Sequence, residues 1–426
     1  MSKNRLLDPT QTTRETLRDY REHGGYDRAA WSWTPAELID LITQSGLLGR
    51  GGSAFPTGRK WRAVADQPGR HAVLVNAAES EPASRKDEAL LLLRPHLVIE
   101  GALIAAHAVG ASDLIFYLHS GSSQIEESIS EAVKELDRSG SNPPNIRLVT
   151  AEPGYVAGEE TAAIQRVNGH AAKPTAKPPR PFERGIRRRP TLVQNVETLA
   201  NVPLIVTHGV DWFRSIGTPE LPGTLLITLT GAVANPGVYE VPGGAEISWI
   251  LDETGGLERG ESLYALLPGG YFSGWLREQD VRRGATLQPD SLRQYGAALG
   301  TAAITVVPNS VCGLRQAAAL LRFFAEESAR QCGPCTFGTS AMADILERVV
   351  YGRADSDDLN RLRRYAEEML PRRGACGHLD GAALAARSAL EVFRNEIPQH
   401  MRNGNCGRAN RVILPGLERY GDDGQE

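Results

Sequence analysis

The spacing of apolar and polar positions predicts helices and strands that alternate along the first half of the chain. Apolar residues recur at helical spacing over 36–47, whereas AVLVN, within 71–80, is an apolar run typical of a buried strand. The order then repeats, with helices over 95–111 and 122–140 and strands over 113–120 and 146–152. Alternating strands and helices indicate an α/β fold with a parallel, helix-covered sheet.

The pattern changes twice after this region. Over 223–256 the chain reads as a strand, an Asn-Pro-Gly turn, a short strand and a helix, and AAITVVP adds a later strand, which together predict a small α+β unit. Helical periodicity dominates over 311–400 and predicts a helical bundle with cysteines at the helix joints. The first 35 residues are polar with an exposed-looking helix pattern, and the last 25 or so are polar and predicted to be irregular.

Composition narrows the class of protein. A length of 426 residues favours two or three domains, and a net charge of −4 supplies no field that would attract nucleic acid. No apolar run reaches the roughly 18 residues of a membrane span. The start, MSKNRLLDPTQTTRE, lacks the apolar segment of a secretion signal, and five cysteines are too few for a disulfide framework. We therefore expect a cytoplasmic protein with reduced thiols.

The segment GLLGRGGSAFPTGRKW (46–61) has the composition of an anion-binding loop. Its glycines leave backbone N–H groups accessible, and Arg50 and Lys60 add positive charge. It matches neither the Walker loop nor a GxGxxG turn after a strand. A purely structural loop remains the alternative.

Two further loops follow predicted strands, where open α/β sheets bind ligands. NAAESEP (76–82) places Asn76, Glu79, Ser80 and Glu81 in one loop, which could also be a solvated turn with a helix cap. In GYVAGEETAAI (154–164), Gly158 permits close approach, and the two glutamates that follow could simply cap a helix. The proline-rich, basic segment 171–190 is either a linker or a loop over a ligand.

The cysteines suggest a metal or redox site. Cys332-Gly-Pro-Cys335 lies between helical segments, and Cys376 comes later in the same region. Three cysteines in a reduced helical domain suit an iron–sulfur cluster, while His378 would also allow a Cys3His zinc site, and inert thiols are the third possibility. The other two cysteines, at 312 and 406, lie outside this spacing and are interpreted as ordinary.

In this order the segments resemble the NADH-binding flavoprotein subunits of respiratory complex I (the F subunits of NADH-quinone oxidoreductase), and the related diaphorase subunits of hydrogenases and formate dehydrogenases. The resemblance covers roughly residues 40–400. It rests on GRGGSAFPTGRKW, NAAESEPASRKDEALLLLRPH, AGEETAAI, KPPRPFERGIRRRPTLVQNVETLANVP, and the cluster-binding ends ESARQCGPCTFGT and GACGHLDGAA.

The resemblance implies three domains between two terminal segments. These are an N-terminal extension (1–35), a Rossmann-like FMN and NADH domain (36–222), a β-grasp, soluble-ligand-binding domain (223–310), a helical iron–sulfur domain (311–400) and a C-terminal tail (401–426). NADH would deliver hydride to FMN, and electrons would leave through a [4Fe–4S] cluster to a separate iron–sulfur or ferredoxin-like chain. The protein could associate peripherally with a membrane complex.

The resemblance also assigns residues. Glu160 would be catalytic, near the flavin, and Phe55, Glu81, Glu160 and Lys177 would meet NADH. Cys332, Cys335 and Cys376 would bind the cluster. The FMN site would comprise Gly49, Arg50, Gly51, Lys60, Asn76, Glu79, Ser80, Tyr155, Gly158, Glu159, Glu160, Asn195 and Thr198.

The chain departs from the family pattern at several positions. Ala329 stands where the family has the first cluster cysteine, so that Cys312, Cys406, His378, water or a partner would have to complete a cubane; a three-iron cluster or no cluster is the other outcome. Ala63, Ala78, Arg180 and Gln194 alter the nucleotide and flavin segments. Arg180 and the arginines after it could attract a phosphorylated dinucleotide or an acidic carrier protein. Two alternative functions follow: an FMN electron relay that does not oxidise nicotinamide, and a non-catalytic subunit.

Overall fold

The computed structural model describes residues 4–27, 32–139 and 145–421. The chain divides into two compact units. Unit one comprises Met1–Ser80, Arg85–Leu226 and Val238–Gly244, and unit two comprises Glu81–Ser84, Ile227–Gly237 and Ala245–Glu426. The finer division into five segments remains a prediction.

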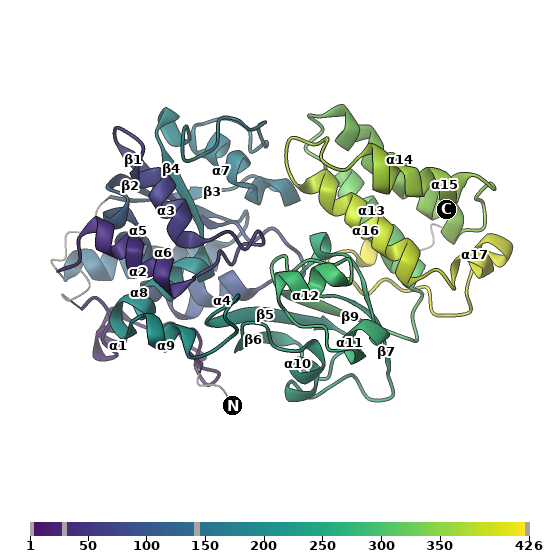
Figure 1. Cartoon of the computed structure of the whole chain (residues 1–426), viewed down its shortest axis with the longest axis horizontal. Helices are drawn as coiled ribbons and strands as arrows, with labels where there is room; N and C mark the ends of the chain where they lie inside the picture. The colour runs from purple at the N-terminus through teal and green to yellow at the C-terminus, as the bar shows by residue number, and fades with distance from the viewer. Residues whose placement is uncertain (1–3, 28–31, 140–144, 422–426) are drawn as a thin grey trace. The chain divides into compact units, whose positions relative to one another are not determined.

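Unit one contains a four-stranded parallel sheet, in the order β3-β2-β1-β4. Its strands are β1 (His71–Ala77), β2 (Ala111–Leu118), β3 (Ile146–Thr150) and β4 (Thr191–Asn195) (Figure 1). The predicted strands near 71, 113 and 146 are thus confirmed. Strand β4 was not predicted, because its five residues directly follow a proline-rich, basic segment whose composition indicates a loop.

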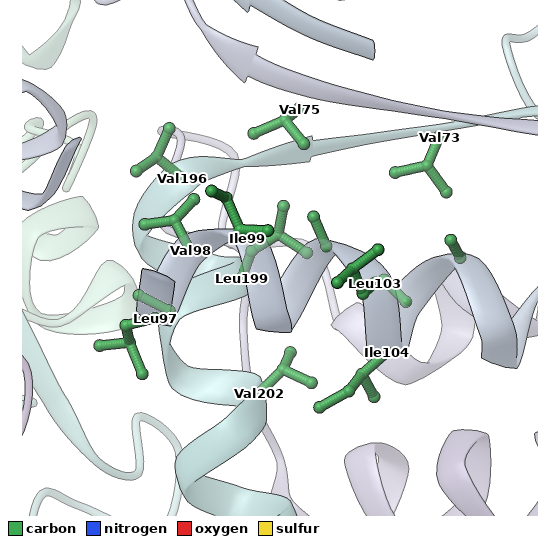
Figure 2. Packing of buried hydrophobic residues seen from close by; sticks show 14 of the residues in the cluster. Val73, Val75, Leu97, Val98, Ile99, Leu103, Ile104, Val196, Leu199 and Val202 are labelled. Atoms are coloured by element: carbon green, nitrogen blue, oxygen red, sulfur yellow. The ribbon is translucent and has the colours of Figure 1, made fainter. Parts of the chain in front are cut away.

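Helices cover both faces of this sheet. On one face, Val73 and Val75 of β1 point toward apolar residues of α5 (Pro95–Ala108) and α8 (Val196–His208) (Figure 2). On the other face, Ala72 and Leu74 belong to a second cluster that includes Ala163 of α7 (Glu160–Val167). Because β1 is buried on both faces, its apolar run is continuous rather than alternating. Unit one also contains α2 (Pro35–Ser45), α3 (Thr57–Ala65), α4 (Lys86–Leu93), α6 (Ser123–Arg138), α9 (Val210–Arg214) and the short 3-10 turns η2 (Tyr155–Gly158) and η3 (Ile186–Arg188).

The N-terminal segment is more buried than its polar composition suggested. It contains helix α1 (Leu17–Glu22), capped by Thr16, and Leu6, Leu17 and Tyr20 all lie in the main apolar cluster of unit one. The exposed-looking pattern was misleading, because a few large apolar side chains spaced along a polar segment are enough to anchor it.

A second sheet has the order β6-β5-β9-β7-β8, with β5 and β9 parallel and β7 antiparallel to both β8 and β9. Its strands are β5 (Thr224–Gly231), β6 (Gly237–Pro242), β7 (Leu263–Leu267), β8 (Leu276–Arg277) and β9 (Ala303–Pro308). Helices α10 (Ile247–Glu253), α11 (Glu278–Arg282) and α12 (Pro289–Gln294) and the 3-10 turn η4 (Tyr271–Ser273) accompany it. The strands and the helix expected over 223–256, and the later strand at AAITVVP, are thus present as β5, β6, α10 and β9.

The C-terminal part of unit two is helical, as predicted. Helix α13 (Gly313–Glu326) packs against α14 (Gly333–Val350) and α16 (His378–Val392) (Figure 1). Helices α15 (Asp358–Arg364) and α17 (Ile397–Asn403), the π-helical turn η5 (Tyr365–Met369) and the 3-10 turn η6 (Glu418–Tyr420) complete it. Among the described residues, no single helix is both long and apolar enough to cross a bilayer; α4 and α5 meet that test only as a pair bent by 99°.

Candidate functional site

The glycine-rich loop between α2 and α3 rests on the start of helix α8. The backbone N–H of Arg50 donates to Thr198 Oγ1 over 2.8 Å, and the Arg50 guanidinium donates to the carbonyl of Pro222 over 2.9 Å. A Cβ at Gly51 would lie 3.1 Å from that of Asn195. The loop therefore packs closely against the N-terminus of α8, and a side chain larger than that of Gly51 has little room there.

The loop after β1 meets the turn before α7. Asn76 Nδ2 donates to the carbonyl of Gly158 over 2.8 Å, and Ser80 Oγ donates to that of Tyr155 over 2.7 Å. A Cβ at Gly158 would lie 2.8 Å from both Ala78 O and Ser80 Oγ, which is too close for any side chain. The two loops can therefore approach this closely only because residue 158 is glycine.

Two of the predicted flavin residues cap helices. The Glu79 carboxylate accepts hydrogen bonds from the first backbone N–H groups of α4, at 3.1 Å from Lys86 and 3.0 Å from Glu88. Glu159 accepts from the N–H groups of Thr161 and Ala162 at the start of α7. Both caps stabilise the helix ends on which the loops depend.

Four charged side chains form a network above the α7 N-terminus. Lys177 Nζ lies 3.0 Å from Glu159 and 2.7 Å from Glu160, and Lys60 Nζ lies 3.5 Å from Glu160. Burial lowers the pKa of Lys60, although Glu160 opposes the shift. Burial alone would raise the pKa of Glu160, but Lys60 and Lys177 hold it below its usual value. Glu160 is therefore an ionised carboxylate, fixed between two ammonium groups.

A second charged cluster lies deeper and was not anticipated from the sequence. Lys86 Nζ lies 2.8 Å from Asp87 and 2.9 Å from Glu197, and all three side chains are buried. Asn195 joins it by donating to Asp87 over 2.6 Å. The sequence does contain a clue to this cluster, because Lys86 and Asp87 come just before an apolar helical run and Glu197 interrupts another. Charged residues buried in such helices are nearly always paired.

These loops meet at one edge of the sheet of unit one. Asn76 and Asn195 are register partners at the carboxyl ends of β1 and β4, the edge at which α/β sheets hold ligands. Among the residues that the structure describes, Arg50 Nε and Nη1 and Asn76 Oδ1 are buried without a hydrogen-bond partner. Buried polar atoms of this kind normally have a partner. Two unfilled donors and one acceptor therefore fit a ligand that carries both anionic and hydrogen-bonding groups, as FMN does.

Two residues expected to meet NADH lie apart from these contacts. Phe55 is 44% exposed, with the Arg59 guanidinium 5.6 Å from its ring centre. Glu81 belongs to unit two, is buried, and accepts a hydrogen bond from the Tyr271 N–H over 3.0 Å. The contacts of Glu81 are therefore structural ones within unit two.

The three cysteines of the predicted cluster site share one end of the helical part. Cys332 precedes α14, Cys335 lies in its first turn, and Cys376 precedes α16. Burial raises the pKa of the Cys335 thiol to about 11, and the nearby thiols of Cys332 and Cys376 add to the rise, while a contact of 3.2 Å with Ser328 Oγ opposes it. Cys332 and Cys376 thus both lie near Cys335.

The remaining candidates for a fourth ligand lie elsewhere or are engaged. Cys312 stands before the first residue of α13, whereas Cys335 contacts Ser328, two residues beyond the last, and Cys332 and Cys376 lie near Cys335. A 14-residue helix is about 21 Å long. Cys406 is grouped with Cys312. The Nε2 of His378 lies 2.7 Å from the carbonyl of Phe324. Neither Cys312 nor Cys406 can therefore complete a cluster on the other three.

Three family models match the chain in succession. The Nuo51 FMN-binding domain matches residues 42–204, the SLBB domain matches 226–270, and the NADH-ubiquinone oxidoreductase-F iron-sulfur binding region matches 315–400. The F subunit of the NADH-quinone oxidoreductase of Streptomyces coelicolor is 36% identical over 403 residues, which cover 92% of this chain and 89% of that one. This chain belongs to the family of NADH-quinone oxidoreductase F subunits.

Other members of this wider group are nearly as similar. The NADP-reducing hydrogenase subunit HndC of Solidesulfovibrio fructosivorans is 32% identical, with 94% of this chain and 83% of that one covered. The NAD+-reducing [NiFe]-hydrogenase in its air-oxidized state superposes with a TM-score of 0.81 at 28% identity, over 96% of this chain and 70% of that one. In the H2-reduced state the TM-score is 0.77, and the match covers 66% of the hydrogenase chain.

The family matches support the expected fold class and cofactor domains. A mixed α/β fold with a parallel sheet, an SLBB domain, an FMN-binding domain and an iron–sulfur binding region are all present. The match to the FMN-binding domain includes the loops described above.

Proposed function

We propose that this chain binds FMN at the carboxyl edge of the unit-one sheet, oxidises NADH there and passes the electrons to a separate iron–sulfur protein. The observation that carries the proposal is the meeting of the three loops around unfilled polar atoms of Arg50 and Asn76. The family membership supports the same reaction, because relatives are named as NADH-quinone oxidoreductase and NADP-reducing hydrogenase subunits. Bound FMN supplies the chemistry that links a two-electron hydride donor to one-electron acceptors.

The glycine-rich loop would hold the FMN phosphate. Gly49 and Gly51 keep the backbone N–H groups accessible, and Arg50 and Lys60 supply positive charge from a buried guanidinium and a half-buried ammonium. The buried position strengthens these interactions, since little water screens them. Thr198 positions the loop through the Arg50 N–H.

The β1 loop and the α7 turn would hold the ring system. Asn76 Oδ1 can accept a hydrogen bond from the flavin, while its Nδ2 stays on Gly158. Ser80 would keep the β1 loop on the α7 turn by donating to the carbonyl of Tyr155, with Asn195 at the neighbouring strand end. Glu79 and Glu159 act as positioning residues, because they cap the helices on which these loops rest.

Glu160 would set the charge near the flavin. Its carboxylate is held by Lys60 and Lys177, so it stays ionised and cannot move far. Lys177 and Phe55 would face the incoming dinucleotide. Of the two, Lys177 has the stronger support, since its ammonium already lies 2.7 Å from the Glu160 carboxylate.

The three cysteines at the start of α14 and α16 would bind an iron–sulfur cluster through three thiolates. Ala329 offers no fourth ligand, and Cys312 lies at the opposite end of α13. The residues therefore fit a cluster with one site that the chain's cysteines do not fill. The electron acceptor would be a separate ferredoxin-like chain, and the protein would work in the cytoplasm, peripheral to any membrane complex.

The test is an anaerobic titration of the FMN-loaded chain with NADH and, separately, with NADPH. The absorbance of the flavin is recorded after each addition. Bleaching by either nucleotide supports the proposal and identifies the donor. A bound flavin that neither nucleotide bleaches would favour the relay function, and a chain that binds no FMN would favour a non-catalytic subunit. Asn76→Ala should weaken FMN binding at least tenfold, corresponding to about 1.4 kcal/mol for a lost hydrogen bond to a buried group. Asn405→Ala, at an exposed position in unit two, is the matched control and should bind FMN normally.

A further inference from the structure

Four potential metal ligands gather at the start of helix α13, away from the predicted cluster site. They are Cys312, Glu396, His400 and Cys406, and their ligand atoms all lie within 4.8 Å of one another. Cys312 and His400 are fully buried, Glu396 is 3% exposed and Cys406 is partly buried. All four belong to unit two, and among the described residues no other group of three such ligands meets this distance.

The histidine is oriented as a ligand would be. His400 Nδ1 lies 2.7 Å from the carbonyl of Val350, an acceptor only, so Nδ1 carries the hydrogen and Nε2 carries the lone pair. That lone pair faces Cys312 Sγ over 3.1 Å. A backbone carbonyl on the second nitrogen is the usual means of fixing a metal-binding imidazole.

We propose that Cys312, His400, Cys406 and Glu396 form a closed tetrahedral site for a thiophilic divalent cation, with zinc as the expected occupant. Two sulfurs, one imidazole nitrogen and one carboxylate oxygen are ligand types that zinc takes, and four protein ligands leave no open position. Thiolate and imidazole donors disfavour the hard cations Mg²⁺ and Ca²⁺. The site is therefore structural and not catalytic.

The surrounding charges balance such an ion. Two thiolates and the Glu396 carboxylate carry three negative charges, a divalent cation supplies two positive charges, and Arg408 on Glu396 supplies the third. Without a cation, burying two thiolates beside a carboxylate would be costly, so the thiols would stay protonated. Metal binding would release those protons and exchange the contact of 3.5 Å between Cys312 Sγ and Glu396 Oε2 for two bonds to the ion.

The ion would hold the C-terminal segment against the helical part. Glu396 already accepts from the N–H groups of Gly313 and Leu314, so it caps α13, and the Cys312 N–H donates to Ala409 O over 2.9 Å. Residues 404–417 contain no helix or strand, and a metal bond to Cys406 would anchor them where backbone hydrogen bonds are few. The site requires neither FMN nor the cluster, so its failure and that of the proposed function are separate outcomes.

Metal analysis of the full chain, purified anaerobically, tests the site. We expect about one zinc per chain, lost in Cys406→Ser with iron unchanged, whereas Cys376→Ser, the matched control at the cluster site, should lose iron and keep zinc. Cobalt(II) added to the zinc-depleted chain should give the thiolate-to-cobalt absorption of a tetrahedral sulfur site, absent in Cys406→Ser. This measurement serves even if zinc is lost during purification.

Three results would overturn the proposal. One is a chain that contains no zinc and gives no cobalt–thiolate absorption. Another is an intact mass two hydrogens short, with peptide mapping that joins Cys312 to Cys406 as a disulfide. The last is equal loss of iron in Cys406→Ser and Cys376→Ser, which would make Cys406 part of the cluster site.

Discussion

The side-chain amide of Asn76 donates to the carbonyl oxygen of Gly158 over 2.8 Å, which joins the end of strand β1 to the turn before helix α7. The amide oxygen of the same side chain is left buried and unpaired among the described residues. One asparagine thus joins two loops through its donor, and its acceptor is the atom that we propose binds the flavin.

Gly158→Ala should disrupt this junction. The new Cβ would lie 2.8 Å from Ala78 O and Ser80 Oγ, so the β1 loop or the α7 turn must shift. We expect a loss of about 1–3 kcal/mol in unfolding free energy and a marked loss of FMN affinity, measured by urea unfolding and flavin fluorescence. Gly121→Ala meets no atom within 4 Å but has a φ of +79°, so it should lose stability while binding FMN normally. Normal FMN binding by Gly158→Ala would contradict the assignment of this turn.

Glu160→Gln should raise the midpoint potential of bound flavin. Removing the carboxylate charge leaves Lys60 without its ion-pair partner, whereas Lys177 keeps Glu159, so the network becomes more positive by one charge, and positive charge favours the more negative reduced flavin. Changing one charge beside the flavin should change the free energy of its reduction by on the order of 1–2 kcal/mol, which is a few tens of millivolts for a two-electron couple. Spectroelectrochemical titration measures the shift, with Glu131→Gln on the exposed side of α6 as the control. An unchanged potential would place Glu160 away from the flavin.

Lys86→Met should be among the most destabilising single changes in unit one. Methionine fills a similar volume but leaves Asp87 and Glu197 buried without their common cation. Breaking a buried pair in this way costs about 3–5 kcal/mol. Lys134→Met, whose exposed ammonium lies 3.6 Å from Glu131, should change the unfolding free energy by about 1 kcal/mol or less. Urea denaturation of both variants gives the comparison, and equal losses would argue against the buried cluster.

Ala329→Cys should restore a fourth thiolate at the cluster site. The position precedes Cys332 by the spacing of the family motif and follows Ser328, which contacts Cys335 Sγ. We expect more iron and sulfide per chain and a slower loss of the cluster in air. Metal analysis and electron paramagnetic resonance measure both. Ala329→Ser controls for size without adding a thiolate. No gain in iron from the cysteine would mean that position 329 lies outside the site.

Glu135 should make the fold sensitive to acid. Burial alone would raise the pKa of Glu135, but hydrogen bonds from Arg14, His96 and the Leu17 N–H lower it to about 2. Because the ordinary pKa of a glutamate is 4.5, this carboxylate stabilises the fold above about pH 4.5, and the contribution is lost as the pH falls toward 2. The stability difference between the natural chain and Glu135→Gln, from urea midpoints at several pH values, should shrink over that interval. A constant difference would show that the pKa is not lowered.

Much of this protein follows from local patterns. The apolar runs near 71, 113 and 146 identified strands, because a strand buried on both faces must be apolar at every position. The glycine-rich loop and the polar ends of two strands marked a ligand site, since parallel strands end at a common edge. The motif order identified the family, and family models match in the same order.

The sequence alone therefore predicted most of the helices and strands, the family and the region where we propose that a flavin binds. It missed β4, because pairing with β1 rather than local propensity makes Thr191–Asn195 a strand. It could not show that Cys312 and Cys406 lie beside Glu396 and His400, or that Lys86 lies between Asp87 and Glu197. Apart from Lys86 and Asp87, these groups come from different parts of the chain, so only tertiary packing decides which of them meet. A charged group that this packing buries must have a partner close by.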